Sequence, residues 1–174
     1  MKKIIIVYGL IAGIICAAVL GISSILGSGS LSYEYGMYFG FTSMILAAVV
    51  MWFGIAQYKK HLGGKISFGK AFLTGFLMTL IASSMYVAAW MITGPENFGR
   101  TYSEYEAQSM RNEGINEAKI AKHMESNREM WEKYDSNPAF RAALTYVEIV
   151  PVQLIIVLIA SVVLSIRKKK EMAV

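Results

Sequence analysis

The stretch Ile4–Leu26, IIIVYGLIAGIICAAVLGISSIL, contains no Asp, Glu, Lys or Arg. A helix needs roughly 17–25 mostly apolar residues to cross a bilayer, and this stretch has that length. Three further stretches share both properties: Tyr38–Tyr58, Ala71–Ile92 and Ile149–Ile166. The sequence therefore predicts an all-α membrane protein, one integral membrane domain over residues 1–174, with four transmembrane helices.

The charge of the chain is sparse and unevenly placed. Only 17% of its 174 residues are charged, against about 25% in soluble domains. The net charge of +5 comes mainly from basic residues that flank the apolar stretches: Lys2, Lys3, Lys59, Lys60, Lys65, Lys70, Arg167, Lys168, Lys169 and Lys170. This placement indicates the cytoplasmic surface of a lipid bilayer and argues against a nucleic-acid partner.

The same lysines predict an orientation. Positive residues at both ends of the chain and in the connection Lys59–Lys70 place all three on the cytoplasmic side of a bacterial inner membrane, with both termini inside. The Gly/Ser-rich link Gly27–Met37 is then an outer hairpin. A cleaved signal peptide is the alternative for the first stretch, but its apolar run is longer than the ~7–15 residues of such signals, so we expect a retained helix.

Residues 93–146 are predicted to form an extracytoplasmic helical segment. Capping boxes at Thr101 and Ser103 favour a short helix from about Tyr102 to Asn112. Asn116 then caps a second helix that runs to about Tyr134, and Asn137 caps the final helix, which begins with a first-turn proline.

One face of the second outer helix is the candidate surface for a protein partner. Its apolar residues recur at helical spacing: Ile120, Met124, Trp131 and Tyr134. The alternative is that this face packs on the preceding short helix or on the top of the bundle.

The connection between the second and third apolar stretches is a candidate site for anionic lipid headgroups. It carries Lys59, Lys60, Lys65 and Lys70 around the sequence GKISFGKA at residues 64–71. That sequence approaches the phosphate-binding P-loop pattern, but Ala71 stands where the pattern needs a hydroxyl, and no strand precedes it. We therefore expect a tight Gly63–Gly64 turn, a cap at Ser67 and lysines at headgroup depth.

Glu148, Pro151 and Gln153 form the candidate polar site at the outer boundary of the last stretch. An ionisable residue near a membrane span suggests function, and the proline frees a backbone carbonyl one turn earlier. The alternative is a carboxylate that simply reaches interfacial water.

Small residues recur every four positions in two of the apolar stretches, at Gly9, Gly13, Ala17 and Gly21 and at Ala71, Gly75, Thr79 and Ser83. Such faces allow close helix approach. They favour packing within the chain's own bundle, with homo-oligomerisation as the alternative.

The chain resembles the bacterial membrane family called domain of unknown function 4199. The resemblance covers most of the sequence and is most specific at Gly63–Phe72; the other matching stretches are Met1–Gly13, Phe53–Tyr58, Thr79–Ser83 and Pro151–Lys168. It implies a small four-span bacterial membrane protein and carries no activity, ligand or catalytic residue.

The chemistry-bearing residues suggest binding rather than catalysis. His61 and His123 are expected on opposite sides of the membrane, and the sequence offers no catalytic set, metal cluster or cofactor motif. We therefore expect a non-enzymatic interaction or accessory protein that contacts the lipid bilayer and possible partners: another membrane protein or a second copy of the chain. A small carrier or lipid-binding protein that uses Glu148 is the alternative.

Overall fold

The computed structural model describes residues 1–26 and 30–166, apart from the side chains of residues 23–35 and 37. Over these residues the chain is all-helical, as predicted. Its elements are α1 (Lys2–Leu26), α2 (Ser30–His61), α3 (Phe68–Thr93), α4 (Phe98–Asn112), α5 (Glu117–Ser136) and α6 (Pro138–Ser165).

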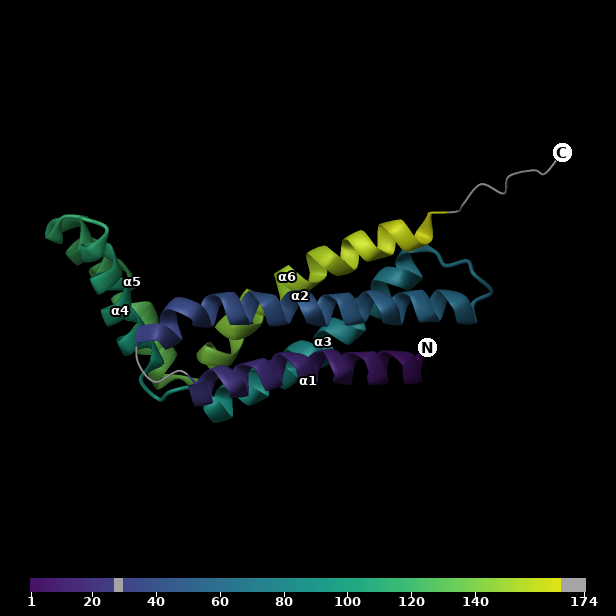
Figure 1. Cartoon of the computed structure of the whole chain (residues 1–174), viewed down its shortest axis with the longest axis horizontal. Helices are drawn as coiled ribbons and strands as arrows, with labels where there is room; N and C mark the ends of the chain where they lie inside the picture. Colours follow the sequence, from purple (N-terminus) through teal and green to yellow (C-terminus); the bar gives the residue numbers. More distant parts are fainter. Residues whose placement is uncertain (27–29, 167–174) are drawn as a thin grey trace.

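Helices α1, α2, α3 and α6 form an elongated bundle, and α4 and α5 form a hairpin at one end of it (Figure 1). The start of α1, the α2–α3 connection and the end of α6 lie together at the opposite end. We call this the lysine end, because Lys2, Lys3, Lys59, Lys60, Lys65 and Lys70 are found there. The basic cluster expected after the last span lies outside the described residues.

The surface around the middle of the bundle, which we call its waist, is apolar. Large hydrophobic side chains point outward from each of the four helices, such as Ile14 on α1, Phe53 on α2, Leu73 on α3 and Ile155 on α6. Only 28–44% of each apolar stretch is buried inside the chain. All four helices are long and apolar enough to cross a membrane, in agreement with the four predicted stretches.

Glycines let the bundle helices approach closely. A Cβ atom added at Gly13 would lie 2.5 Å from the Met85 sulfur, and one added at Gly75 would lie 2.4 Å from a methyl group of Val157. The faces predicted to pack within the bundle do so at these positions, between α1 and α3 and between α3 and α6. At Gly21 and Gly40, by contrast, an added Cβ would have no described atom of another helix within 4 Å.

Two predicted boundaries are wrong. The link expected at Gly27–Met37 is helical from Ser30 onward, so α2 is longer than predicted, while residues 27–29 of that link lie outside the described residues. Helix α4 begins at Phe98 rather than near Tyr102. The predicted caps at Asn116 and Asn137 are confirmed, since their side chains accept hydrogen bonds from Lys119 N and from the first amides of α6.

Candidate functional site

The α2–α3 connection begins with a glycine turn. Gly63 and Gly64 have φ angles of 73° and 84°, a backbone region that favours glycine. The Gly64 amide donates to the Lys59 carbonyl at 3.0 Å and the Gly63 amide to the Lys60 carbonyl at 3.1 Å. These two bonds form a Schellman motif, which ends α2 and turns the chain toward α3, as the Gly-Gly pair predicts.

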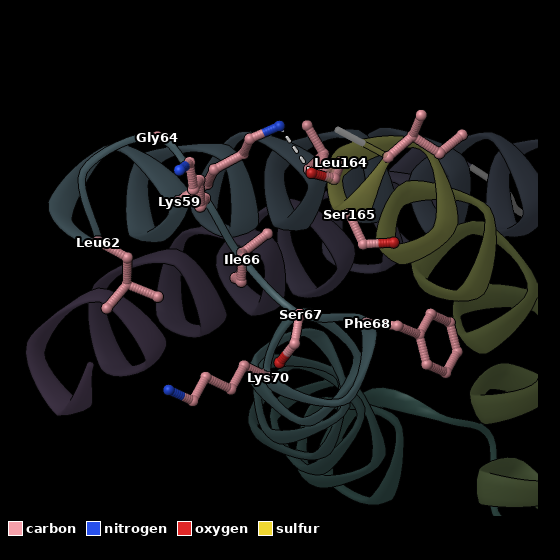
Figure 2. Close-up of a pocket in the computed structure, with 11 residues that line it drawn as sticks. Lys59, Leu62, Gly64, Ile66, Ser67, Phe68, Lys70, Leu164 and Ser165 are labelled. Atoms are coloured by element: carbon pink, nitrogen blue, oxygen red, sulfur yellow. Dashed lines mark hydrogen bonds between the residues drawn. The ribbon is translucent and has the colours of Figure 1, made fainter. Parts of the chain in front are cut away.

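A cavity of about 920 Å³ lies between this connection and the end of α6. Figure 2 shows its walls: the end of α2, the connection, the first turn of α3 and the last residues of α6. Among the residues that the structure describes, three lysines and no acidic residue line it; these lining residues are Lys59, Leu62, Gly64, Lys65, Ile66, Ser67, Phe68, Lys70, Leu164, Ser165 and Ile166. It is therefore a basic cavity with apolar walls.

The four predicted headgroup lysines divide into two groups. Lys59, Lys65 and Lys70 line the cavity, whereas the exposed Lys60 does not. Lys59 is half-buried, and its Nζ donates to the Leu164 carbonyl at 2.7 Å (Figure 2). Because the C-terminal carbonyls of a helix carry partial negative charge, Lys59 stabilises the end of α6 as well as bordering the cavity.

The first turn of α3 faces this region without an acidic residue. Ser67 occupies the N-cap position in the extended conformation that was expected, but its hydroxyl makes no capping hydrogen bond. The amides of the first turn of a helix lack intrahelical acceptors and attract anions. The cavity therefore combines lysine ammonium groups, a free cap hydroxyl and the positive end of a helix.

The structure does not bring the side chains of Glu148 and Gln153 together. Gln153 is fully buried within the bundle, where its Oε1 lies 3.4 Å from the Ser83 hydroxyl, while Glu148 and Pro151 are exposed. Five residues along a continuous helix correspond to a rotation of about 140°. The two polar side chains consequently lie on different faces of α6.

The face predicted for a protein partner is largely covered by the chain itself. Ile120 and Tyr134 are 2% and 5% exposed, and Met124 and Trp131 are partly buried. The Ser103 hydroxyl lies 3.4 Å from the Met124 sulfur, and the Trp131 ring lies 5.3 Å from that of Tyr102. These contacts agree with the alternative stated for this helix, in which the face packs on the preceding short helix, α4.

Five side chains make a junction cluster where the hairpin meets the bundle: Trp90, Phe98, Trp131, Tyr134 and Arg141. The Trp90 indole donates to the Tyr134 hydroxyl at 2.7 Å, and the Phe98 ring lies 5.0 Å from that of Trp90. The Arg141 guanidinium is buried over the Tyr134 ring and donates to the Pro95 carbonyl. This end of the bundle is filled by interactions within the chain.

Sequence reasoning missed Asp135 and Arg141. Both oxygens of Asp135 accept hydrogen bonds from the first amides of α4, at 2.8 Å from Gly99 N and 3.0 Å from Arg100 N. This long-range cap explains why α4 starts before the predicted capping boxes. In the part of the chain that the structure describes, no three His, Cys, Asp or Glu side chains are grouped so that they could hold a metal.

These features define a class: an all-helical bundle with four apolar, membrane-length helices, a basic cavity at one end and a helical hairpin at the other. A family model described as a protein of unknown function, DUF4199, matches residues 7–165. The chain belongs to this family, and the resemblance stated from its sequence is confirmed. Neither the curated proteins nor the solved structures contain a match.

Proposed function

We propose that this chain is a four-span inner-membrane protein that acts by binding rather than by catalysis, and that its working surface is the cavity at the lysine end. Both termini and this cavity lie on the cytoplasmic side in the proposal, and the α4–α5 hairpin lies on the other side. The single observation that carries the binding function is the cavity whose charged lining, within residues 1–26 and 30–166, consists of Lys59, Lys65 and Lys70.

The apolar waist supports the membrane location. Its outward-facing side chains, such as Ile14, Phe53 and Ile155, cost free energy in water at about 25 cal/mol per Å² and are favourable against lipid tails. The waist separates the lysine end from the hairpin along the bundle (Figure 1). Lysines concentrated at one end then favour the cytoplasmic face for that end.

The rival function, a carrier that uses Glu148 and Gln153, has less support. A carrier site needs polar groups that converge on one cavity, and these two residues face different directions on α6. Association through small residues also has less support at Gly9, Gly13 and Gly75, because other helices of the same chain already occupy those positions.

A photo-crosslinking amino acid tests the proposed surface in living cells. We would place it at Ser67, which lines the cavity, and as the matched control at Ser126, an exposed serine on α5. We expect a discrete adduct, either lipid or protein, from position 67 and none from position 126. Adducts from position 126 alone, or from neither position, would contradict a binding function at the lysine end.

A further inference from the structure

We infer that the cavity at the lysine end binds the phosphate headgroup of an anionic phospholipid, with an acyl chain lying along α3. The inference rests on the proposed function, because it requires the lysine end to lie at the membrane surface. It adds the chemical class of the ligand and the path that the ligand follows on the protein.

The charge of the cavity selects an anion. Lys65 and Lys70 are exposed at its rim, Lys59 borders it from α2, and no carboxylate is found among the described lining residues. Lys59 already donates to Leu164, so the two rim lysines have the greater freedom to meet a phosphate. Each lysine near an anionic headgroup contributes roughly 1 kcal/mol, which corresponds to about fivefold in affinity.

A row of three aromatic rings leads from the cavity along α3. Phe68 lines the cavity and stacks on Phe72 with ring centroids 5.9 Å apart and planes 14° apart. Phe72 continues to Phe76 at 6.3 Å and 19°. These residues recur every fourth position, so they share one face of the helix, and Phe68 is exposed while the other two are half-buried. This row offers an apolar track for an acyl chain.

The apolar part of the lining favours a lipid over a soluble phosphate compound. Leu62, Ile166 and Phe68 are 38%, 62% and 43% exposed, and they stand in the same cavity wall as the lysines. A soluble phosphate would leave these side chains against water, whereas the glycerol and upper acyl carbons of a lipid would cover them. The cavity volume of about 920 Å³ falls in the range of small-molecule sites, roughly 300–1,000 Å³.

The test compares two double variants that remove the same charge from the same end. Lys65→Gln with Lys70→Gln removes the two positive charges at the rim of the cavity. Lys3→Gln with Lys60→Gln removes the charges of two exposed lysines that do not line the cavity. Native mass spectrometry of the full chain in mild detergent would follow binding of phosphatidylglycerol, with phosphatidylcholine of the same acyl chains as the zwitterionic comparison. Glycerol 3-phosphate would be added as a headgroup without a chain. A further single variant, Ser67→Glu, places a carboxylate in the cavity wall.

We expect the wild-type chain to bind phosphatidylglycerol in preference to phosphatidylcholine. Affinity should fall at least tenfold in the Lys65/Lys70 variant and in Ser67→Glu, and should stay within about twofold in the Lys3/Lys60 variant. An equal loss in both double variants would show non-specific attraction to charge and overturn the inference. Displacement of the lipid by an equal concentration of glycerol 3-phosphate would assign the site to a soluble phosphate compound and also overturn it. A protein adduct from position 67 together with no lipid preference would remove this inference and leave the proposed binding function standing.

Discussion

The two ends of the bundle use their polar and aromatic side chains differently. At the hairpin end, Asp135 caps α4, Arg141 covers Tyr134, and the Trp90 indole is hydrogen-bonded. At the lysine end, Lys65, Lys70 and Ser67 line a cavity that the described residues leave open. The side chains at the hairpin end therefore stabilise the fold, whereas those at the lysine end are available for a ligand. Substitutions at the first end should therefore reduce stability, and substitutions at the second should reduce binding.

The largest effect is expected at the hairpin end from Trp131→Ala. The indole packs against Phe98 and Tyr102, and truncating a packed tryptophan costs about 3 kcal/mol. Hydrogen exchange of α4 and α5 would measure the loss of protection. Trp131→Phe is the matched control, because it keeps a ring and removes the buried indole N–H, for which no partner is found among the described residues. Equal protection in the alanine and phenylalanine variants would show that the cluster does not stabilise the hairpin.

The next largest change in stability is expected in the bundle between the two ends. Gly75→Ala places a methyl group against Val157 and Ile55 and should destabilise the protein by about 1–3 kcal/mol. Gly36→Ala, where no described atom from outside the adjacent helix backbone lies within 4 Å of the added Cβ, should instead stabilise it by up to about 1 kcal/mol through helix propensity. Unfolding titrations in mixed detergent micelles would give both free energies. If both substitutions changed the free energy of unfolding in the same direction, the result would contradict the close packing of α3 on α6.

A smaller effect is expected from the cap that joins α5 to α4. Asp135→Ala leaves the Gly99 and Arg100 amides without their acceptor and should cost about 1 kcal/mol. Faster hydrogen exchange at these two amides would measure it. Asp135→Asn, which keeps one acceptor oxygen, should lie between wild type and alanine. If alanine left both exchange rates at their wild-type values, Asp135 would not be the cap of α4.

The smallest effect concerns pH at the tip of the hairpin. The hydrogen bond from Arg111 to Glu117, 2.8 Å long, lowers the pKa of the Glu117 carboxyl. A lowered pKa adds stability above the unfolded-state value, about 4.3, and that stability is lost as the pH falls through the folded-state value. Both side chains are exposed, Arg111 at 46% and Glu117 at 70%, so the change in stability should be slight. Arg111→Gln should abolish the acid dependence of exchange protection near this pair; an unaltered dependence would assign it to another group.

Local signals predicted much of this fold, because apolar length, helix caps and a glycine pair act within a few residues. The four membrane-length stretches, the caps at Asn116 and Asn137 and the Gly63–Gly64 turn are examples. The start of α4 was missed because its cap, Asp135, lies more than thirty residues away in the sequence. The bond from Lys59 to Leu164 was equally out of reach, since it joins residues 105 positions apart.

In the candidate sites, too, some features follow from the local sequence and others only from the tertiary structure. The lysines were identified from the sequence, but only the structure separates Lys59, Lys65 and Lys70 from Lys60 by their position around the cavity. The different orientations of Glu148 and Gln153 follow from helical periodicity alone once α6 is taken as continuous. The covering of the α5 face by α4 depends on tertiary packing, which an amphipathic pattern does not specify.

The proposed function requires the lysine end and the hairpin end to lie on opposite sides of the membrane, and cysteine labelling tests this directly. In a Cys16→Ser background, which removes the single native cysteine, Lys60→Cys and Glu125→Cys each place one accessible thiol at the lysine end and on the hairpin. A membrane-impermeant maleimide should label Glu125→Cys in intact cells and Lys60→Cys only after the inner membrane is permeabilised. Labelling of both positions in intact cells, or of Lys60→Cys alone, would contradict the proposed orientation.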